Sequence, residues 1–519
     1  MKKGISYLLI IAILSTFSFV AAQTAGEKVA DTNDDRSMNW PGGSTIARAG
    51  NGDLMLVFGT LGSDNGDSLV YSVSYDDFLQ AWDTPVAIGN GTGESRVISH
   101  ANLVADADNN FHAVWANSFN IVHSKNDGSG WSTPVSVTGT AAPWDTLRAA
   151  HTALSIDSNG NLWVAFSTVW EKDDLSEWCY ASTSTDGGAT WSTPDTLFKD
   201  SLTGEMGGTL GYVHLATGPG GKVGVTVRAP KGEFGYYNCI TQEYDGSTWG
   251  ASEYLKTPAG GHVFGDTVDI YQLSSTYDDA GNRHFAFYTD EKDHDSKEDG
   301  QIYYTKKSTD GTWASPEMLT AFPGGAADYP TIRFGGNDDL YIAFFATGDD
   351  GIRRIYGVNS ADLGANWTSP FQLSADVTES LPARPPSVSQ TIGAAGADVA
   401  WLQPDATATG GYGIFYGLIP KAVVSVDGDV MPSTHKLLRN YPNPFNPSTT
   451  IQFGVESFGD VSLTVYNTLG QEVAQLVEMK METGVYEVTF DARNLASGIY
   501  FYTLKTEEQS LTNKLMLLK

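Results

Sequence analysis

The chain has 519 residues, more than one hydrophobic core usually serves, so we expect two or more folded units or a repeat architecture. Its formal net charge of -30 argues against nucleic acid as a partner, because phosphate-binding surfaces depend on Lys and Arg. The acidic excess indicates either a solvated, self-repelling surface or scattered calcium sites, and composition favours the first.

The first residues have the pattern of an export signal. Lys2 and Lys3 precede an apolar run over residues 5–20, and two small residues, Ala21 and Ala22, follow it. The run is shorter than the roughly 20 apolar residues that span a bilayer. We therefore expect residues 1–22 to be a cleaved signal peptide and no membrane span to remain after its removal.

The sequence offers little metal or disulfide chemistry. Cys179 and Cys239 fall in predicted strands of neighbouring repeats, and we expect them to stay unpaired, with a disulfide as the alternative. No CxxC or Cys/His spacing supports zinc. We expect no cofactor, and calcium is the alternative at the oxygen-rich segment 290–299, which lacks the spacing of an EF-hand.

A repeat runs through the middle of the chain. In each copy, two apolar strands flank a turn that is rich in Asp, Asn and Gly, residues that tolerate positive φ. The copies include ANLVADADNNFHAVWA (101–116), TALSIDSNGNLWVAFS (152–167), STYDDAGNRHFAFYT (275–289) and TIRFGGNDDLYIAFFA (331–346).

After each hairpin come a third strand, a turn, and a Trp that opens a fourth strand. Residues 184–191 and 360–367 fit the pattern SxDxGxxW, which resembles the Asp-box of the sialidase-like (BNR repeat) family. In this motif Asp accepts backbone N–H groups, Gly takes positive φ, and Trp covers the turn, so the motif marks a fold and not an active site. Its residues here are Asp186, Gly188, Trp191, Asp362, Gly364 and Trp367.

Four strands per repeat predict an all-β chain whose residues 23–420 form a β-propeller. The first three strands can be counted seven times, but only six fourth strands follow a Trp. We prefer seven blades, with residues 27–30 supplying the missing outer strand of the last blade. Six blades, the number that the resemblance to sialidases implies, is the alternative.

The composition changes after the repeats, and a linker over residues 421–436 leads into a domain over residues 437–519. Its strands at 461–467, 484–491 and 498–506 alternate and predict a small Ig-like β-sandwich. Four motifs in order resemble the type A sorting domain of type IX secretion: YPNPF (441–445), VYNTLG (465–470), LASGIY (495–500) and KLML (514–517).

This resemblance implies that the type IX secretion machinery is a partner and that the protein is secreted to the medium or the cell surface of a Gram-negative bacterium. A generic adhesion module is the alternative.

The mouth of the propeller channel is the default ligand site. We define the mouth as the end where loops run from each outer strand to the next inner strand and from each second strand to its third. Arginines before four inner strands could bind a carboxylate of a glycan or peptide. They are Arg36, Arg96, Arg148 and Arg384.

Acids in the same loops offer the alternative that each arginine forms an ion pair. These acids are Asp34, Glu94, Asp145, Glu205, Asp266, Asp328 and Glu379.

Aromatic residues at the mouth could stack on sugar rings, or they could simply line the channel and cover the blades. The ligand candidates of this kind are His100, Trp144, His151 and Trp170.

The residues considered above are compatible with two functions. The first is an exported propeller that binds extracellular glycans or proteins without catalysis. The second is a glycoside hydrolase of exo-sialidase type acting on an anionic glycan, which would need an arginine triad, an acid/base Asp and a Tyr–Glu pair. The Arg-Ile-Pro motif of that family is absent, so no catalytic residue carries over from the resemblance.

Overall fold

The structure is a computed structural model of the chain. It describes residues 26–32, 38, 44–60, 69–76, 79, 81–90, 101–117, 120–139, 149–168, 178–199, 211–231, 236–255, 269–290, 300–322, 327–348, 350–374, 386–408, 410–421, 436–441, 443, 445–455, 459–481, 484–493, 495–506 and 509–519.

Contacts divide the chain into two units, Thr24–Lys421 and a unit that contains Ala422–Lys519. Both are built from strands, and a 3₁₀ turn at Pro219–Gly221 is the one helical element among the described residues. None of these residues forms a helix that is long and apolar enough to cross a membrane.

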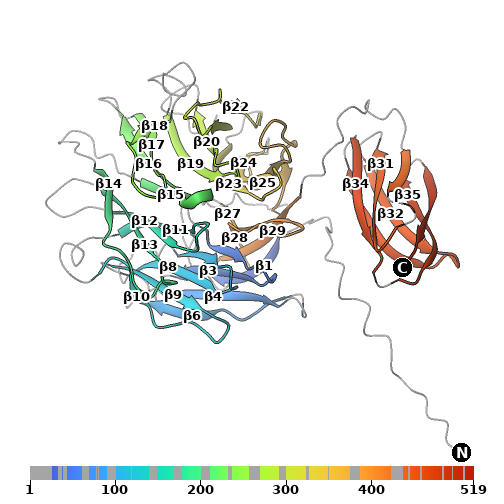
Figure 1. Ribbon diagram of the computed structural model, residues 1–519, viewed down its shortest axis with the longest axis horizontal. Helices are drawn as coiled ribbons and strands as arrows, with labels where there is room; N and C mark the ends of the chain where they lie inside the picture. Colours follow the sequence, from blue (N-terminus) through green and yellow to red (C-terminus); the bar gives the residue numbers. More distant parts are fainter. Residues whose placement is uncertain are drawn as a thin grey trace, which may run out of the picture. The chain divides into compact units, whose positions relative to one another are not determined.

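The described residues of the first unit form seven antiparallel sheets that are arranged radially, like the blades of a propeller (Figure 1). Blade one is β2 (Ile46–Arg48), β3 (Leu54–Thr60), β4 (Leu69–Asp76), β5 (Ala81–Trp82) and β6 (Val86–Asn90). Blade two is β7 (Asn102–Ala105), β8 (Phe111–Asn117), β9 (Asn120–Asn126) and β10 (Val135–Ser136). Blade three is β11 (Ala149–Ile156), β12 (Leu162–Thr168), β13 (Trp178–Ser184) and β14 (Asp195–Lys199).

The other four blades repeat this order. Blade four is β15 (Gly211–Thr217), β16 (Val223–Lys231), β17 (Tyr236–Tyr244) and β18 (Glu253–Tyr254). Blade five is β19 (Asp269–Tyr277), β20 (Arg283–Asp290), β21 (Gln301–Lys307) and β22 (Glu317–Met318). Blade six is β23 (Ala327–Phe334), β24 (Leu340–Thr347), β25 (Arg353–Ser360) and β26 (Phe371–Gln372). Blade seven is β27 (Ser387–Val388), β28 (Gly396–Pro404), β29 (Tyr412–Pro420) and β1 (Glu27–Thr32).

The core of the propeller lies between neighbouring blades. Each blade is buried on both faces, as the burial of every residue from Leu340 to Ala346 in β24 illustrates. Val57 of blade one packs with Trp115 of blade two, and Cys179 of blade three packs with Val225 of blade four. Neither cysteine forms a disulfide, and both side chains are buried in such interfaces.

The ring closes between its first and last blades. Strand β1 pairs antiparallel with β29, from Glu27 opposite Tyr416 to Thr32 opposite Tyr412. The prediction of seven blades, with the outer strand of the last blade supplied by the N-terminal segment, is therefore confirmed, and the six-blade alternative is wrong.

A buried ion pair joins the same two blades. Arg48 at the end of β2 donates from Nε and Nη2 to the two carboxylate oxygens of Asp398 in β28, each over 2.7 Å. The Asp398 side chain is fully buried, and the Tyr416 hydroxyl also donates to it over 2.8 Å.

The two SxDxGxxW turns make a structural contact with the preceding blade. Asp186 accepts hydrogen bonds from Ser184 and Thr190, and the bonds to Thr190 above all lower the pKa of Asp186 to about 2. Gly188, at φ 89°, lies so close to the His123 ring of blade two that a Cβ atom there would be 1.9 Å from it. Gly364 of blade six approaches Tyr304 of blade five in the same way.

The second unit consists of two sheets that share one core. One sheet is β30 (Lys436–Tyr441), β31 (Ser448–Val455) and β34 (Gly484–Asp491). The other is β33 (Glu472–Met481), β32 (Gly459–Asn467), β35 (Gly498–Thr506) and β36 (Ser510–Leu517). The three predicted strands are confirmed, and an Ig-like relation of these sheets stays a prediction.

Two of the sorting motifs lie together although about 70 residues separate them in the chain. The backbone N–H of Phe445 donates to the carbonyl of Met516 over 2.9 Å, and that of Leu518 donates to the carbonyl of Phe445 over the same distance. Asn443 adds a side-chain bond, since its Oδ1 accepts the N–H of Met516 over 2.9 Å. The YPNPF segment thus fixes the last strand of the domain.

Replacing Gly188 by Ala should lower stability more than replacing Gly187, its neighbour. Both glycines have positive φ, so both variants carry backbone strain of about 1–2 kcal/mol, but a Cβ atom at position 187 meets no atom within 4 Å. The Gly188→Ala variant must also displace the His123 ring, which should cost roughly 1–3 kcal/mol more. Thermal unfolding of the two variants measures this difference, and equal midpoints would show that the close contact does not matter.

Loss of the Arg48 guanidinium should weaken ring closure. The Arg48→Ala variant leaves the Asp398 carboxylate buried without its cation, which should cost about 3–5 kcal/mol. Arg354 is the matched control, because its Nη1 and Nη2 also donate one bond each to the two oxygens of a carboxylate, that of Asp350, whose side chain is 49% exposed. Arg354→Ala should therefore cost about 1 kcal/mol or less. Chemical denaturation compares the two, and a similar loss in both would contradict this role of Arg48.

Candidate functional site

One predicted ligand residue, His151, lies among the described residues. The other seven, which lie outside them, are Arg36, Arg96, His100, Trp144, Arg148, Trp170 and Arg384. The site is therefore built outward from His151.

His151 lies on β11, the innermost strand of blade three, five residues before the last paired residue, Ile156. The last paired residues of the inner strands in the next three blades are Thr217, Tyr277 and Phe334. The residue five places before each of them occupies the same position as His151. These equivalent residues are Tyr212, Gln272 and Tyr329. Four consecutive inner strands thus present one layer of side chains at the mouth end of the channel.

The backbone is irregular at this layer. The register of each strand pair shifts beside it, between Ala149 and His151, Gly211 and His214, Ile270 and Gln272, and Asp328 and Thr331. Tyr212 and Tyr329 also have φ values of 57° and 56°, which non-glycine residues rarely adopt. Bulges redirect side chains and, like strained residues, are frequent at functional sites.

Aromatic contacts connect this layer to its neighbours. The His151 and Tyr212 rings lie 5.4 Å apart between centroids, and the guanidinium carbon of Arg228 lies 4.3 Å above the Tyr212 ring. Tyr329 hydrogen-bonds to Gln272, and its ring packs against Phe345 at 5.9 Å. We call the set the mouth-end cluster; its residues are His151, Tyr212, Arg228, Gln272, Asp328 and Tyr329.

Asp328 has the most unusual chemistry of the cluster. It is 9% exposed, and its Oδ1 has no hydrogen-bond partner. Burial raises the pKa of Asp328 to about 7, although the Arg353 guanidinium opposes that shift. The carboxyl group is therefore poised to gain or lose a proton near neutral pH.

The neighbouring groups are held in their neutral forms. Burial, assisted by the Arg228 guanidinium, lowers the pKa of His151 to about 4. Burial and the Asp328 carboxylate raise the pKa of the Tyr329 hydroxyl. At neutral pH the cluster thus offers one titrating carboxyl group beside the neutral imidazole of His151 and the neutral phenol of Tyr329. This set can transfer a proton and contact a polar ligand.

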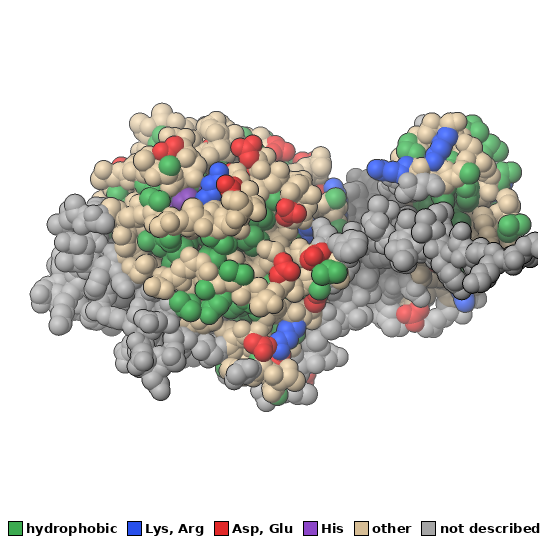
Figure 2. Space-filling model, turned by 90° about the horizontal axis from the view of Figure 1, so that it is seen from below, with side chains coloured by type: hydrophobic (Ala, Val, Ile, Leu, Met, Phe, Trp, Pro, Cys, Tyr) green, Lys and Arg blue, Asp and Glu red, His purple; other side chains and the backbone are tan. Residues whose placement is uncertain are grey.

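Metal binding finds no support in the described part of the chain. No group of three or more His, Cys, Asp or Glu side chains there could hold an ion. On the face in Figure 2 the acidic side chains of the propeller unit are scattered. The calcium alternative at residues 290–299 falls, apart from Asp290, outside the described residues and stays a prediction.

The sequence predicted a ligand site at the mouth of the channel, but it did not predict most residues of the mouth-end cluster. It singled out Asp328 as a loop acid and His151 as a ligand residue, whereas Arg228 and Gln272 carried no signal. Tyr212 and Tyr329 could have been found by aligning the repeats on their turns, since all four residues of the layer then fall at one position.

Solved structures similar to the chain include three carbohydrate-active enzymes. The polysaccharide lyase Uly1 is 11% identical with a TM-score of 0.49, over 78% of this chain and 94% of that one. The GH93 α-L-arabinofuranosidase of Fusarium graminearum is 12% identical with a TM-score of 0.43, over 62% and 92%. The Hadza microbial sialidase Hz136 is 14% identical with a TM-score of 0.37, over 62% and 66%. At such identities the likeness concerns the fold and not the activity.

A comparison with curated proteins finds no significant match. A family model described as "Secretion system C-terminal sorting domain" matches residues 439–518. This match covers all four motifs from which the resemblance to sorting domains was inferred and confirms it. Such a domain directs a protein to the cell surface or the medium. Residues 439–518 are thus a secretion-system C-terminal sorting domain, and the chain that carries it is exported.

Proposed function

We propose that the exported propeller binds an extracellular glycan at the mouth of its channel and cleaves it by acid–base chemistry. The observation that carries the proposal is Asp328, a buried carboxyl group with an unpartnered oxygen and a pKa of about 7. A general acid or base works best when its pKa lies near the operating pH. Burial is the usual means by which enzymes raise a carboxyl group into that range.

The other residues of the mouth-end cluster suit a sugar. The Tyr212 and His151 rings offer apolar faces on which a pyranose ring could stack, and Arg228 could pair with a uronate or sialate carboxylate. In this assignment the protonated Asp328 donates its proton to the glycosidic oxygen as the bond from that oxygen to the anomeric carbon breaks, and water adds its hydroxyl group to that carbon and releases a proton. The Tyr329 hydroxyl, beside Asp328, contacts the same ring.

Binding without catalysis is the second candidate, and one observation favours it. Glycoside hydrolases usually employ two carboxyl groups. In the part of the chain that the structure describes, no second carboxylate contributes to the pKa of Asp328. The four arginines that the sequence suggested for a sialate carboxylate lie outside the described residues, so Arg228 is the one cationic residue of the cluster that could serve a sialidase-type mechanism. The assay therefore has to detect turnover and binding separately.

The first test incubates the full chain with neutral and uronate-containing polysaccharides and with aryl glycosides that include a sialoside. Release of reducing ends or aryl groups should fall by roughly 100-fold or more in the Asp328→Asn variant, the loss typical of a general acid or base. The matched control is Asp350→Asn, which removes an exposed carboxylate from the loop between β24 and β25 of the same blade and leaves Asp328 in place.

Three outcomes are decisive. Turnover that depends on Asp328 supports the proposal, and equal turnover in both variants removes Asp328 from it. No turnover in the wild type, combined with binding on a glycan array, establishes the second candidate instead.

The second test concerns the pKa of Asp328 itself. Between about pH 4 and pH 7 the folded chain keeps a proton on Asp328 that the unfolded chain has released, so the free energy of unfolding decreases as the pH rises through this window. The Asp328→Asn variant cannot ionise. Relative to the wild type it should therefore gain on the order of 2–4 kcal/mol from pH 5 to pH 8.

Denaturant unfolding at several pH values measures this gain. Asp350→Asn is again the control, because hydrogen bonds to Arg354 hold the pKa of Asp350 at about 2 and its charge is constant over the window. Parallel curves for Asp328→Asn and the wild type would show that the pKa of Asp328 is not raised.

A further inference from the structure

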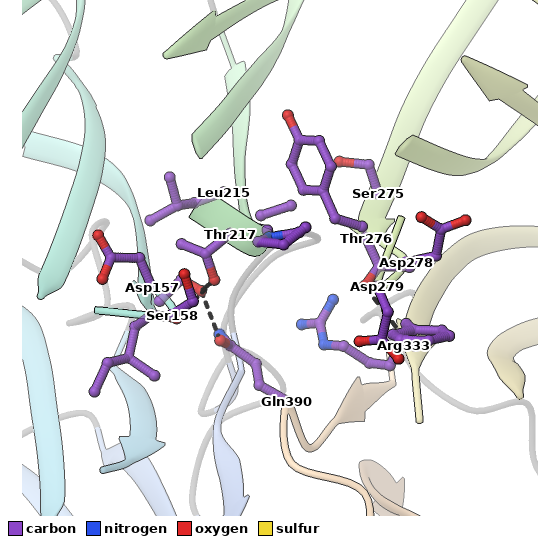
Figure 3. A pocket seen from close by; sticks show the side chains of 17 residues that line it. Asp157, Ser158, Leu215, Thr217, Ser275, Thr276, Asp278, Asp279, Arg333 and Gln390 are labelled. Atoms are coloured by element: carbon purple, nitrogen blue, oxygen red, sulfur yellow. Dashed lines mark hydrogen bonds between the residues drawn. The ribbon is translucent and has the colours of Figure 1, made fainter. Parts of the chain in front are cut away.

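A cavity lies at the opposite end of the propeller channel, which we call the turn end because the first and second strands of each blade are joined there. Its volume is about 340 Å³, near the lower limit for small-molecule sites. Residues of five consecutive blades line it, including Ser155, Thr217, Thr276, Arg333 and Gln390. Figure 3 shows the Arg333 and Gln390 side chains directed toward the middle of this ring of residues.

Side chains that cross the channel shape the cavity. Gln390 of blade seven donates to the carbonyl of Leu154 in blade three over 2.6 Å and accepts from the Ser155 hydroxyl over 2.8 Å. The Ser155 hydroxyl also lies 2.9 Å from that of Thr217 in blade four. These bonds make one wall of the cavity polar and hold it in place.

Arg333 forms the opposite wall and is incompletely paired. It is 4% exposed, and its Nη1 donates to the carbonyl of Ile332 over 2.9 Å and lies 3.5 Å from Nε2 of His214. Its Nε and Nη2 have no hydrogen-bond partner. Unpaired buried donors on a cation are costly and uncommon.

Among the described residues, no carboxylate pairs with this guanidinium or contributes to its pKa. Burial alone lowers the pKa of Arg333 to about 10, so the guanidinium is still cationic at neutral pH. His214 does not help, since burial and the nearby guanidinium groups lower its pKa well below the usual range and keep it neutral. An anion bound in the cavity would offset the cost of this buried charge.

Another arginine of the same ring indicates which anion fits. Arg48 uses the same pair of nitrogens, Nε and Nη2, to hold the two oxygens of Asp398 at 2.7 Å each. These two N–H groups are parallel and match the spacing of carboxylate oxygens. Arg333 presents this pair of donors, and no carboxylate in the described part of the chain accepts from it.

We propose that the Arg333 Nε/Nη2 pair binds the carboxylate of a small ligand, no larger than a monosaccharide, in the turn-end cavity. A uronic acid fits this description: its carboxylate pairs with Arg333, and its hydroxyl groups face the polar wall of Ser155, Thr217 and Gln390. Asp157, Asp278 and Asp279 also line the cavity, and their negative charges disfavour a doubly charged ligand such as sulfate more than a singly charged one. The site is separate from the mouth-end cluster and does not depend on the function proposed there.

Calorimetric titration of the full chain with D-glucuronate, D-glucose and sulfate at matched ionic strength tests the proposal. Glucuronate should bind, and glucose and sulfate should bind at least tenfold more weakly. Arg333→Gln should reduce glucuronate affinity at least tenfold. Arg333→Lys keeps the charge but loses the paired donors, so it should also bind at least tenfold more weakly, and it serves if the Gln variant does not fold.

Arg228→Gln is the control for binding at the mouth, because Arg228 is the residue proposed to hold a uronate carboxylate there, and the glucuronate affinity that depends on Arg333 should be unchanged in this variant. Equal binding by the wild type and both Arg333 variants would overturn the proposal, as would equal binding of glucuronate and glucose. Sulfate binding as tight as glucuronate binding would overturn the choice of a carboxylate.

Discussion

Closure of the ring is the constraint on which the rest of the propeller depends. An open ring would expose the edges of its first and last sheets and leave its inner strands free to spread. Strand β1 removes the edge of blade seven, and the buried Arg48–Asp398 pair joins blades one and seven. The channel residues lie within hydrogen-bonding distance of one another because the seven inner strands must converge.

The two ends of the channel have opposite chemistry, and one strand contributes to both. Strand β23 carries Asp328 at the mouth end and Arg333 at the turn end. The carboxyl group is shifted toward its neutral form, whereas the guanidinium remains a cation that lacks an anion. In both cases burial raises the energy of the charged form, and a bound ligand could offset that cost. The channel thus contains two ionisable side chains, Asp328 and Arg333, whose charged forms are destabilised by burial.

Different parts of the chain provide stability, export and ligand binding. The SxDxGxxW turns connect neighbouring blades through glycines that pack against His123 and Tyr304, and these contacts stabilise the ring. The C-terminal unit has its own core and carries the export signal. Ligand chemistry is left to the inner strands of blades three to six and to the residues of blade seven that reach across the channel.

The sequence by itself determined the features that depend on local pattern. Alternating strands around Asp, Asn and Gly turns predicted each blade, the missing fourth strand of the last repeat predicted the role of residues 27–30, and four ordered motifs predicted the sorting domain. Tertiary structure alone decided the chemistry of the channel. Ring closure decides which strands lie side by side, and three properties of the channel depend on it. Asp328 has a buried oxygen without a hydrogen-bond partner, Arg333 has two N–H donors without one, and Gln390 bonds to Ser155, 235 residues away in the chain. No periodicity within a repeat contains that information, because each of these properties arises between blades.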